Sequence, residues 1–213
     1  PGPLTFVLKK KNSSKVSSYA TANLDTIAVR FPNNSIIRNI LKKIKFPLAI
    51  PSANKSAGIS PVKASHVVEE FGEQIKMILN GGDCKIGIES TVIDLSKKIR
   101  ILRPGFVDIS KITKIIKSKV LLKNNSNKIK APGALKKHYS PDIPMKLNQK
   151  KGFKNYAFIA FGKNYVKSKN TFNLSKKSNL QEAARNLYKI LRKIKNSNYN
   201  KIYVAKIPNK GIG

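Results

Sequence analysis

The chain has 213 residues, of which 43 are lysine or arginine and 10 are aspartate or glutamate, so the formal net charge is +33. No run of eighteen apolar residues occurs, which excludes a membrane span, and the first residues do not have the pattern of a secretory signal. The single cysteine, Cys84, excludes an internal disulfide and is typical of a reducing compartment. We therefore expect a cytoplasmic protein without membrane contact.

The positive charge is concentrated in the second half of the chain. Residues 109–213 carry 26 of the basic side chains and only 2 of the acidic ones. A surface for tRNA or double-stranded RNA would explain this excess. A lysine-, asparagine- and isoleucine-rich composition also follows from A+T-rich coding, and only 6 arginines are present, although RNA recognition favours arginine. Both explanations stay open.

The first half of the chain alternates between short apolar segments and helical patterns. The segments are rich in Val, Ile and Leu and predict strands over 4–10, 26–32, 46–50, 76–80, 91–95 and 100–102. Helices are expected over 35–44 with Ser35 as the N-cap, from Pro61 onward with Ser60 as the cap, and over 108–118. Strands that alternate with helices indicate an α/β fold.

The second half begins with a linker and ends in a small unit. Residues 119–151 contain a polar stretch without apolar periodicity. Beyond them, a strand over 156–161, a helix over 178–195 and a strand over 201–207 form a β-α-β pattern, which predicts a parallel sheet. Ser178 and Gln181 match a capping box at the start of that helix.

Polar motifs lie at the ends of several predicted strands. The most informative is P-S-A-N-K-S-A-G-I-S-P over residues 51–61, between a strand and a helix, where open α/β sheets bind ligands and where a helix N-terminus favours anions. Other motifs are P-G-P-L-T over 1–5, A-V-R-F-P over 28–32, G-I-E-S-T-V over 87–92 and L-R-P-G over 102–105. The linker contains A-P-G-A-L-K-K-H-Y-S-P over 131–141.

The usual catalytic side chains are scarce. The two histidines, His66 and His138, are far apart in the sequence, and no Cys, His or Asp cluster has metal-ligand spacing, so we expect no protein-bound metal. His66 is expected on the surface or at the boundary of its helix. Nucleotidyl transfer is compatible with this scarcity, because it requires alignment and neutralised phosphate charge rather than a side-chain nucleophile.

In order and spacing, these motifs resemble the Sua5/YrdC/YciO family, and specifically the two-domain, Sua5-type threonylcarbamoyl-AMP synthases. The resemblance extends over nearly the whole chain. It implies a YrdC-like twisted mixed sheet with helices in residues 1–118, an interdomain linker over 119–151 that closes over the active site, and a small Rossmann-like parallel α/β Sua5 domain over 152–213. The family also has an earlier segment with a Lys-x-Arg motif. We therefore expect a chain truncated at both ends that is inactive by itself.

The resemblance also implies an activity. These enzymes are nucleotidyltransferases that join L-threonine, bicarbonate or CO₂, and ATP, with Mg²⁺, into L-threonylcarbamoyladenylate and pyrophosphate. The product passes to the tRNA threonylcarbamoyl-transfer machinery, which makes N6-threonylcarbamoyladenosine (t6A) at position 37 of tRNAs that read ANN codons.

Site residues can be carried over from the motifs. The resemblance assigns three residues to L-threonine, namely Arg30, Ser52 and Ser90. It assigns six residues to ATP, namely Thr26, Asn54, Ser60, Arg103, His138 and Tyr139. A guanidinium suits the planar carboxylate of threonine, which makes Arg30 its expected partner. For Ser60, helix capping is an equally good explanation. No catalytic side chain is assigned.

Two other functions are compatible with parts of the pattern. One is a YrdC-like RNA-binding module without synthase activity, but such a module does not need the small-molecule set of Arg30, Ser52, Asn54, Ser90 and Arg103. The other is the related domain of maturation factors that form a carbamoyl adenylate. The H-Y-x-P linker and the β-α-β unit that follows it favour the Sua5 type.

Overall fold

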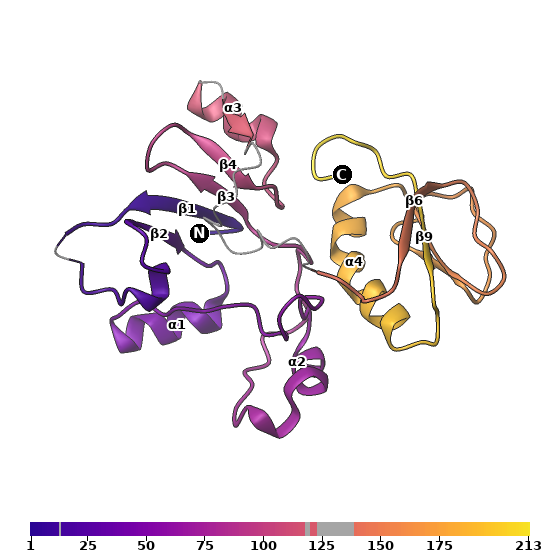
Figure 1. The fold of residues 1–213 in the computed structure, drawn as a ribbon, viewed down its shortest axis with the longest axis horizontal. Coiled ribbons are helices and arrows are strands. Elements are labelled where there is room, and N and C mark those ends of the chain that lie inside the picture. The colour runs from indigo at the N-terminus through magenta and orange to yellow at the C-terminus, as the bar shows by residue number, and fades with distance from the viewer. Residues whose placement is uncertain (13, 118–119, 123–138) are drawn as a thin grey trace. The chain divides into compact units, whose positions relative to one another are not determined.

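The computed structural model describes residues 1–12, 14–117, 120–122 and 139–213. These residues divide into two compact units (Figure 1). Those within 1–51 and 89–135 form the first unit, and those within 52–88 and 136–213 form the second. Each unit contains one β-sheet. The domain boundaries expected from the sequence, at residues 118 and 151, stay a prediction.

The first unit is built on a mixed five-stranded sheet of order β2-β1-β3-β4-β5. Its strands are β1 (Leu4–Lys9), β2 (Thr26–Arg30), β3 (Thr91–Asp94), β4 (Arg100–Arg103) and β5 (Leu121–Leu122). β1 is antiparallel to β2 and parallel to β3, whereas β3 is antiparallel to β4. The unit also contains the 3-10 turn η1 (Tyr19–Thr21) and the helices α1 (Ser35–Ile44) and α3 (Ile109–Ile116).

The core of the first unit lies between its sheet and α3. Ile93 of β3, Ile101 of β4 and Ile112 of α3 are each at most 5% exposed and pack together. α3 starts where the carboxylate of Asp108 accepts a hydrogen bond from the Ser110 backbone N–H at 2.8 Å. Apolar burial therefore joins α3 to β3, which directly follows Ser90, and to β4, which ends at Arg103.

The second unit is built on a parallel sheet of order β6-β9-β7-β8. Its strands are β6 (Met145–Gln149), β7 (Ala157–Ala160), β8 (Thr171–Asn173) and β9 (Ile202–Ala205). Its helical elements are α2 (Ala64–Phe71), the 3-10 turn η2 (Gly72–Gln74) and α4 (Leu180–Lys195). β7, α4 and β9 form the predicted β-α-β crossover, so the expected α/β class, a mixed sheet followed by a parallel one, is confirmed.

Helix α4 lies against the parallel sheet (Figure 1). One buried cluster joins Ile159 of β7 and Ile202 of β9 to the buried face of the helix, which includes Leu191 and Ile194. The same cluster contains Ile59 of the polar motif over 51–61 and Val62, which directly follows that motif. The end of that motif is therefore part of the hydrophobic core of the second unit.

Two predicted strands are wrong. Residues 46–50 and 76–80 form no strand, and large apolar side chains in them stay exposed, with Ile50 at 65% and Met77 at 76%. Pro47 lies inside the first segment and Pro51 follows it directly, and proline has no N–H to donate to a ladder. The second segment pairs with no other strand in the described part of the chain, so its apolar composition alone was misleading.

Three predicted helix caps are also wrong. Asn34, not Ser35, caps α1 by accepting a hydrogen bond from the Ile37 N–H. α2 begins at Ala64 after Lys63, so Ser60 and Pro61 do not start that helix. In α4, Asn179 accepts from the Glu182 N–H in place of the predicted capping box of Ser178 and Gln181. At the starts of α1 and α4, the cap is an asparagine next to the predicted serine. Both side chains can accept the hydrogen bond from the N3 N–H, so the residue type alone does not decide which one caps the helix.

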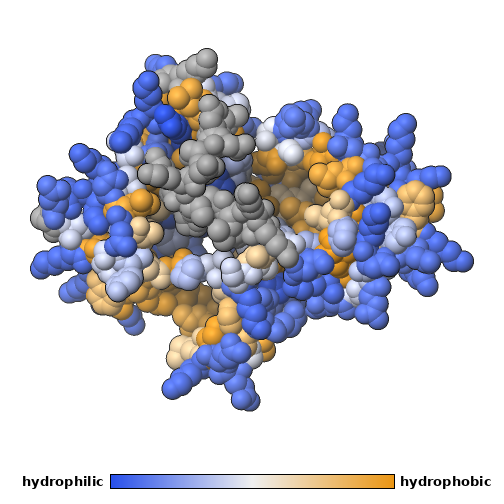
Figure 2. Space-filling view, in the orientation of Figure 1, coloured by the Kyte–Doolittle hydropathy of each residue, from blue (hydrophilic) through white to orange (hydrophobic). Residues whose placement is uncertain are grey.

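Two strands of the second unit, β6 and β8, were not predicted. β6 lies at the edge of the sheet with four of its five residues exposed, and β8 has only three residues. β6 alternates apolar and polar residues over Met145–Asn148 but is mostly exposed, and β8 has a single apolar residue, Phe172, so neither contains a run of apolar residues. Apolar side chains also gather on the surface near α1, where no helix residue is buried (Figure 2).

Candidate active site

Ser90 and Arg103 form the centre of a polar cluster in the first unit. β3 and β4 are antiparallel, and Val92 pairs with Arg103, so the end of β4 lies beside the start of β3. The Arg103 Nη2 donates to the Ser90 carbonyl at 2.9 Å and to the Ser90 Oγ at 3.0 Å, and Nε donates to the same carbonyl at 3.2 Å. Ser90 is only 4% exposed. One guanidinium therefore fixes both the backbone and the hydroxyl of this serine.

Thr5 is a member of this cluster that sequence reasoning missed. β1 runs parallel to β3 with Leu4 opposite Thr91, which brings Thr5 next to Ser90. Their hydroxyl oxygens share a hydrogen bond of 2.7 Å. The available signal was that Thr5 is the one polar residue in the apolar run over 4–8. The two hydroxyls together can direct a donor and an acceptor toward a small polar ligand.

Arg30 joins the same end of the sheet. It pairs with Thr5 across the antiparallel β1 and β2 strands, and its Nε donates to the Gly2 carbonyl at 2.9 Å. Partial burial, and next the positive charge of Arg103, lower the pKa of Arg30 below its ordinary value. The guanidinium still carries its charge at neutral pH, because arginine titrates far above that range. Because the positive charges of Arg30 and Arg103 repel each other, an anion bound near both side chains would stabilise both charges.

Gly105 sets the spacing inside this cluster. A Cβ on Gly105 would lie 2.4 Å from the Thr91 nitrogen, 2.5 Å from the Ser90 carbonyl carbon and 2.6 Å from the Glu89 oxygen. The next residue continues the contact, since the Phe106 N–H donates to the Glu89 carbonyl at 3.1 Å. The R-P-G motif therefore needs glycine so that the backbone after β4 can lie against the backbone that carries Ser90.

The structure does not bring Thr26 into this group. Thr26 is the first residue of β2 and pairs with Lys9, whereas Arg30 is the last residue of β2 and pairs with Thr5. Four residues of extended strand correspond to about 13 Å. The ATP role of Thr26 stays a prediction that rests on the resemblance.

A second group of predicted residues lies in the second unit, in the loop over 52–60. Ser52 is exposed, and Asn54 shapes the loop by donating from Nδ2 to the carbonyls of Lys55 at 2.8 Å and Gly58 at 3.3 Å. The Oδ1 of Asn54 is buried and accepts no hydrogen bond from any described residue. A buried acceptor without a donor costs free energy, so this atom is suited to accept a hydrogen bond from a ligand.

The linker motif contacts this same loop. The Ser140 N–H donates to the Ala57 carbonyl at 3.0 Å, and the ring of Tyr139 stacks on Tyr188 of α4 with 5.7 Å between centroids. Tyr139 has a positive φ of 58°, an uncommon conformation for an aromatic residue. Tyr139, Asn54 and Ser60 thus lie in one unit with Ser52. His138 lies outside the described residues.

Ser60 and His66 differ from expectation. Ser60 is 8% exposed, and its carbonyl accepts a 3.4 Å hydrogen bond from Arg192. The prediction that His66 lies at the surface is wrong, because the side chain is only 5% exposed and its Nδ1 accepts a hydrogen bond from the Val62 N–H at 3.3 Å. The side chain of His66 therefore holds the turn before α2. The helical pattern of the sequence shows only a polar residue beside the apolar stripe.

The buried histidine should make stability depend on pH. Burial, and next the charge of Arg192, lower the pKa of His66 below 6.5; the other nearby charges are Glu69, Lys63 and Asp83. Below pH 6.5 the unfolded chain binds a proton that the folded protein does not. The free energy of unfolding should therefore fall as the pH decreases toward the folded-state pKa, by at most about 1.4 kcal/mol per pH unit for this group.

Urea unfolding between pH 7.5 and pH 5 checks this dependence. His66→Asn keeps a side-chain acceptor for the Val62 N–H but does not titrate, so its stability should fall less over this range than that of the unaltered protein. Equal slopes for the two proteins would contradict the assignment.

The described residues also limit other kinds of site. They contain no group of three or more His, Cys, Asp or Glu side chains that could hold a metal ion. No helix among them is long and apolar enough to cross a membrane.

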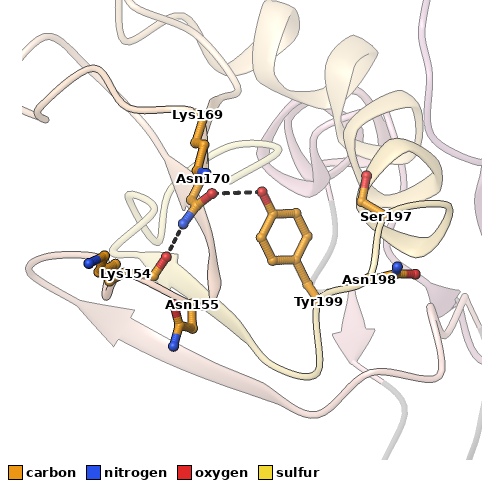
Figure 3. Close-up of a pocket in the computed structure, with 7 residues that line it drawn as sticks. All are labelled: Lys154, Asn155, Lys169, Asn170, Ser197, Asn198 and Tyr199. Atoms are coloured by element: carbon orange, nitrogen blue, oxygen red, sulfur yellow. Dashed lines mark hydrogen bonds between the residues drawn. The ribbon is translucent and has the colours of Figure 1, made fainter.

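A shallow depression of about 440 Å³ lies elsewhere in the second unit (Figure 3). Its lining residues precede β7, β8 and β9, so it lies at the amino edge of the parallel sheet, opposite the edge where such sheets usually bind ligands. Tyr199 donates to Asn170 Oδ1 at 2.9 Å, and Asn170 donates to the Lys154 carbonyl. None of the predicted site residues lines it. The RNA contact considered for the lysine-rich half stays a prediction.

Comparisons with known proteins agree with the motifs. Residues 1–105 match the family Sua5_yciO_yrdC, described as telomere recombination, and residues 107–213 match Sua5_C, the C-terminal domain of threonylcarbamoyl-AMP synthase. The chain is 34% identical to the threonylcarbamoyl-AMP synthase of Pyrococcus abyssi and 29% identical to that of Bacillus subtilis. Each alignment covers all of this chain and 67% of the relative.

Solved structures give the same result. The crystal structure of P. abyssi Sua5 complexed with L-threonine has a TM-score of 0.87 and 31% identity, over all of this chain and 67% of that one. A variant of P. abyssi Sua5 with a histidine and a tyrosine changed to alanine gives 0.85 and 31%, with 66% of that chain covered. This chain therefore spans about two thirds of the length of these relatives.

Fold and relatives together define an α/β enzyme of the nucleotidyltransferase type. The chain belongs to the Sua5/YrdC family of threonylcarbamoyl-AMP synthases, as the sequence motifs predicted.

Proposed function

We propose that this protein forms L-threonylcarbamoyladenylate and pyrophosphate from L-threonine, bicarbonate or CO₂, and ATP. The observation that carries this proposal is the cluster of Arg30 and Arg103 with the paired hydroxyls of Thr5 and Ser90. It combines positive charge for a carboxylate with hydroxyls for a small polar substrate. The relatives named above are threonylcarbamoyl-AMP synthases, and one solved relative is a complex with L-threonine.

The reaction needs few protein groups. The amine of threonine adds to CO₂ and loses a proton, which gives a carbamate. A carbamate oxygen then attacks the α-phosphorus of ATP while the bond between that phosphorus and the bridging oxygen breaks, so pyrophosphate leaves with the electron pair. The protein aligns the reactants and neutralises charge, which hydroxyls, amides and guanidinium groups can do.

We assign the threonine to Arg30, Ser90 and Ser52. Arg30 would hold the carboxylate, because a guanidinium donates two parallel hydrogen bonds to that group. Ser90 would contact the substrate from a hydroxyl already oriented by Arg103 and Thr5. Ser52 is exposed, and its threonine role rests on the family resemblance.

We assign the nucleotide to a second set of residues. Asn54 is the best supported, because its buried Oδ1 has no donor among the described residues and suits an N–H or O–H of ATP. Tyr139 is supported by its strained backbone and by the contact of its neighbour Ser140 with the Asn54 loop. Arg103 supplies positive charge for the phosphates. Thr26, Ser60 and His138 keep their ATP roles on the family resemblance alone.

Magnesium fits this site only as part of the nucleotide. Mg²⁺ prefers hard oxygen ligands and in nucleotide sites is commonly held by phosphates, waters and one or two carboxylates. The described residues offer no cluster of carboxylates near the predicted ATP residues. We therefore expect Mg²⁺ to be held by the ATP phosphates and to neutralise their charge together with Arg103.

The domain organisation and the partner follow the same proposal. Residues 1–118 would provide the synthase domain, 119–151 the linker that covers the site, and 152–213 the Sua5 domain. The adenylate would pass to the machinery that transfers threonylcarbamoyl groups to tRNA.

Amino-acid selectivity tests the proposal. The full-length protein should bind L-threonine in preference to L-serine and L-valine, because a buried hydroxyl partner and a methyl contact are each worth about 1–3 kcal/mol. Calorimetry gives the affinities, and pyrophosphate release should require both L-threonine and bicarbonate. Equal affinity for serine and threonine would disprove the pocket assignment. Release that depends on carbamoyl phosphate would instead indicate the related carbamoyl-adenylate chemistry.

A further inference from the structure

Arg192 is a buried arginine near the end of α4 that the proposed reaction does not use. It is 8% exposed and lies in the second unit together with the loop over 52–60. Its Nη2 donates to the Ile59 carbonyl at 2.5 Å and to the Glu70 Oε2 at 3.1 Å, and its Nε donates to the Ser60 carbonyl at 3.4 Å. A single guanidinium thus holds two consecutive carbonyls of the loop and a carboxylate of α2.

Glu70 extends this contact to the other end of the loop. While Oε2 pairs with Arg192, Oε1 accepts a hydrogen bond from the Lys55 N–H at 3.0 Å. Burial acts to raise the pKa of Glu70, but the Lys55 hydrogen bond and Arg192 outweigh it, so the pKa lies below its ordinary value. The carboxylate is therefore charged near neutral pH and connects both ends of the segment 55–60.

The loop itself is tightly shaped between these two anchors. Ala57 has a positive φ of 65°, and the Gly58 N–H closes a turn on the Lys55 carbonyl at 3.0 Å. A Cβ on Gly58 would lie 3.0 Å from that carbonyl and 3.5 Å from the Glu70 Oε1. Asn54 precedes the turn and donates to the carbonyls at its two ends, Lys55 and Gly58. The position of its unsatisfied Oδ1 therefore depends on the turn.

The two parts of the contact come from different family segments. The loop and Glu70 lie within residues 1–105, which match the first family, whereas Arg192 lies within residues 107–213, which match the second. Ile59 is 2% exposed and packs in the same core cluster as Leu191, the residue before Arg192. The segment over 107–213 thus supplies both apolar packing and hydrogen bonds to the loop.

We propose that Arg192 is a positioning residue that, through Glu70, holds the loop over 52–60 in the shape that presents Ser52 and Asn54 to the substrates. Arg192 then contributes to substrate affinity without touching a substrate. The expected effect on substrate affinity rests on the proposed function, whereas the expected effect on the shape of the loop rests on the geometry of the loop alone.

The test compares Arg192→Lys, Arg192→Gln and Glu70→Gln with Lys189→Gln as the matched control. Lys189 lies on the same helix and is exposed. Lysine at 192 keeps the charge but loses the planar fork, so it cannot hold both carbonyls and the carboxylate together. We expect the KM for ATP and for L-threonine to rise at least tenfold in the three variants, with a smaller change in kcat, and to stay unchanged in the control.

Amide hydrogen exchange gives a readout that is independent of activity. The Lys55 and Gly58 amides should exchange at least tenfold faster in the Arg192 and Glu70 variants than in the control, at temperatures well below the melting temperature. If the full-length protein shows no synthase activity, the proposed function fails, and exchange alone still decides the positioning role.

Two outcomes would overturn the inference. One is a lower melting temperature with unchanged KM values and unchanged exchange at Lys55. This result would show that the contact between Arg192 and Glu70 only stabilises the fold. The other is failure of all three variants to fold at 25 °C, which would have the same meaning, because Arg192→Lys and Glu70→Gln each keep a hydrogen-bonding group of similar size.

Discussion

Gly105→Ala should lower both the stability of the protein and its affinity for L-threonine. The new Cβ would lie 2.4–2.6 Å from backbone atoms of residues 89–91, none of which can rotate away as a side chain could. The strand start that carries Ser90 must therefore shift, and overpacking of this kind costs about 1–3 kcal/mol or more. Urea unfolding measures the loss of stability, and calorimetry measures the affinity for L-threonine.

Gly2→Ala is the matched control for this change. Gly2 lies in the same unit, and a Cβ there would meet no atom within 4 Å. Its carbonyl acceptor for Arg30 is kept, so stability and threonine affinity should stay close to those of the unaltered protein. A Gly105→Ala variant that behaved like this control would show that the close approach between residues 105 and 89–91 is not needed.

Arg103→Lys should lower kcat/KM by about 10²–10³, the usual loss when one preorganised electrostatic contact is removed. Lysine keeps the charge, but a single ammonium cannot donate to the Ser90 carbonyl and hydroxyl in the way that the fork does. The Ser90 hydroxyl then loses its fixed orientation, and the charge beside Arg30 becomes mobile. Steady-state pyrophosphate release with saturating bicarbonate measures the effect.

Arg100→Lys separates this effect from a general loss of charge. Arg100 is the first residue of β4, exposed and opposite Asp94, so it lies at the other end of the strand from the cluster. We expect its kcat/KM to change less than twofold. If Arg103→Lys were equally mild, the guanidinium fork would have no role in the reaction.

The sequence determined most of the first unit. Strands over 4–9, 26–30, 91–94 and 100–103 form within apolar runs, and a proline lies at or near one end of three of them, where it cannot donate to a ladder: Pro3, Pro32 and Pro104. The same rule failed over 46–50, where proline prevents pairing, and over 76–80, where no partner strand exists among the described residues. Strand formation needs a neighbour, and a single segment does not contain that information.

The sequence also predicted several residues of the candidate site, but not how they are held. Motif order identified Arg30, Ser90 and Arg103, and the structure brings these three together at one end of the sheet. It could not identify Thr5, because its contact with Ser90 joins residues 85 positions apart.

Only the tertiary structure decided how the loop over 52–60 is shaped. Arg192 reaches it across 132 and 133 positions of sequence, and the burial of His66 follows from the same packing of α2 near α4. Local propensity and motif spacing describe what a segment prefers by itself. Long-range hydrogen bonds and shared apolar burial depend on which segments become neighbours, and folding of the whole chain alone fixes that choice.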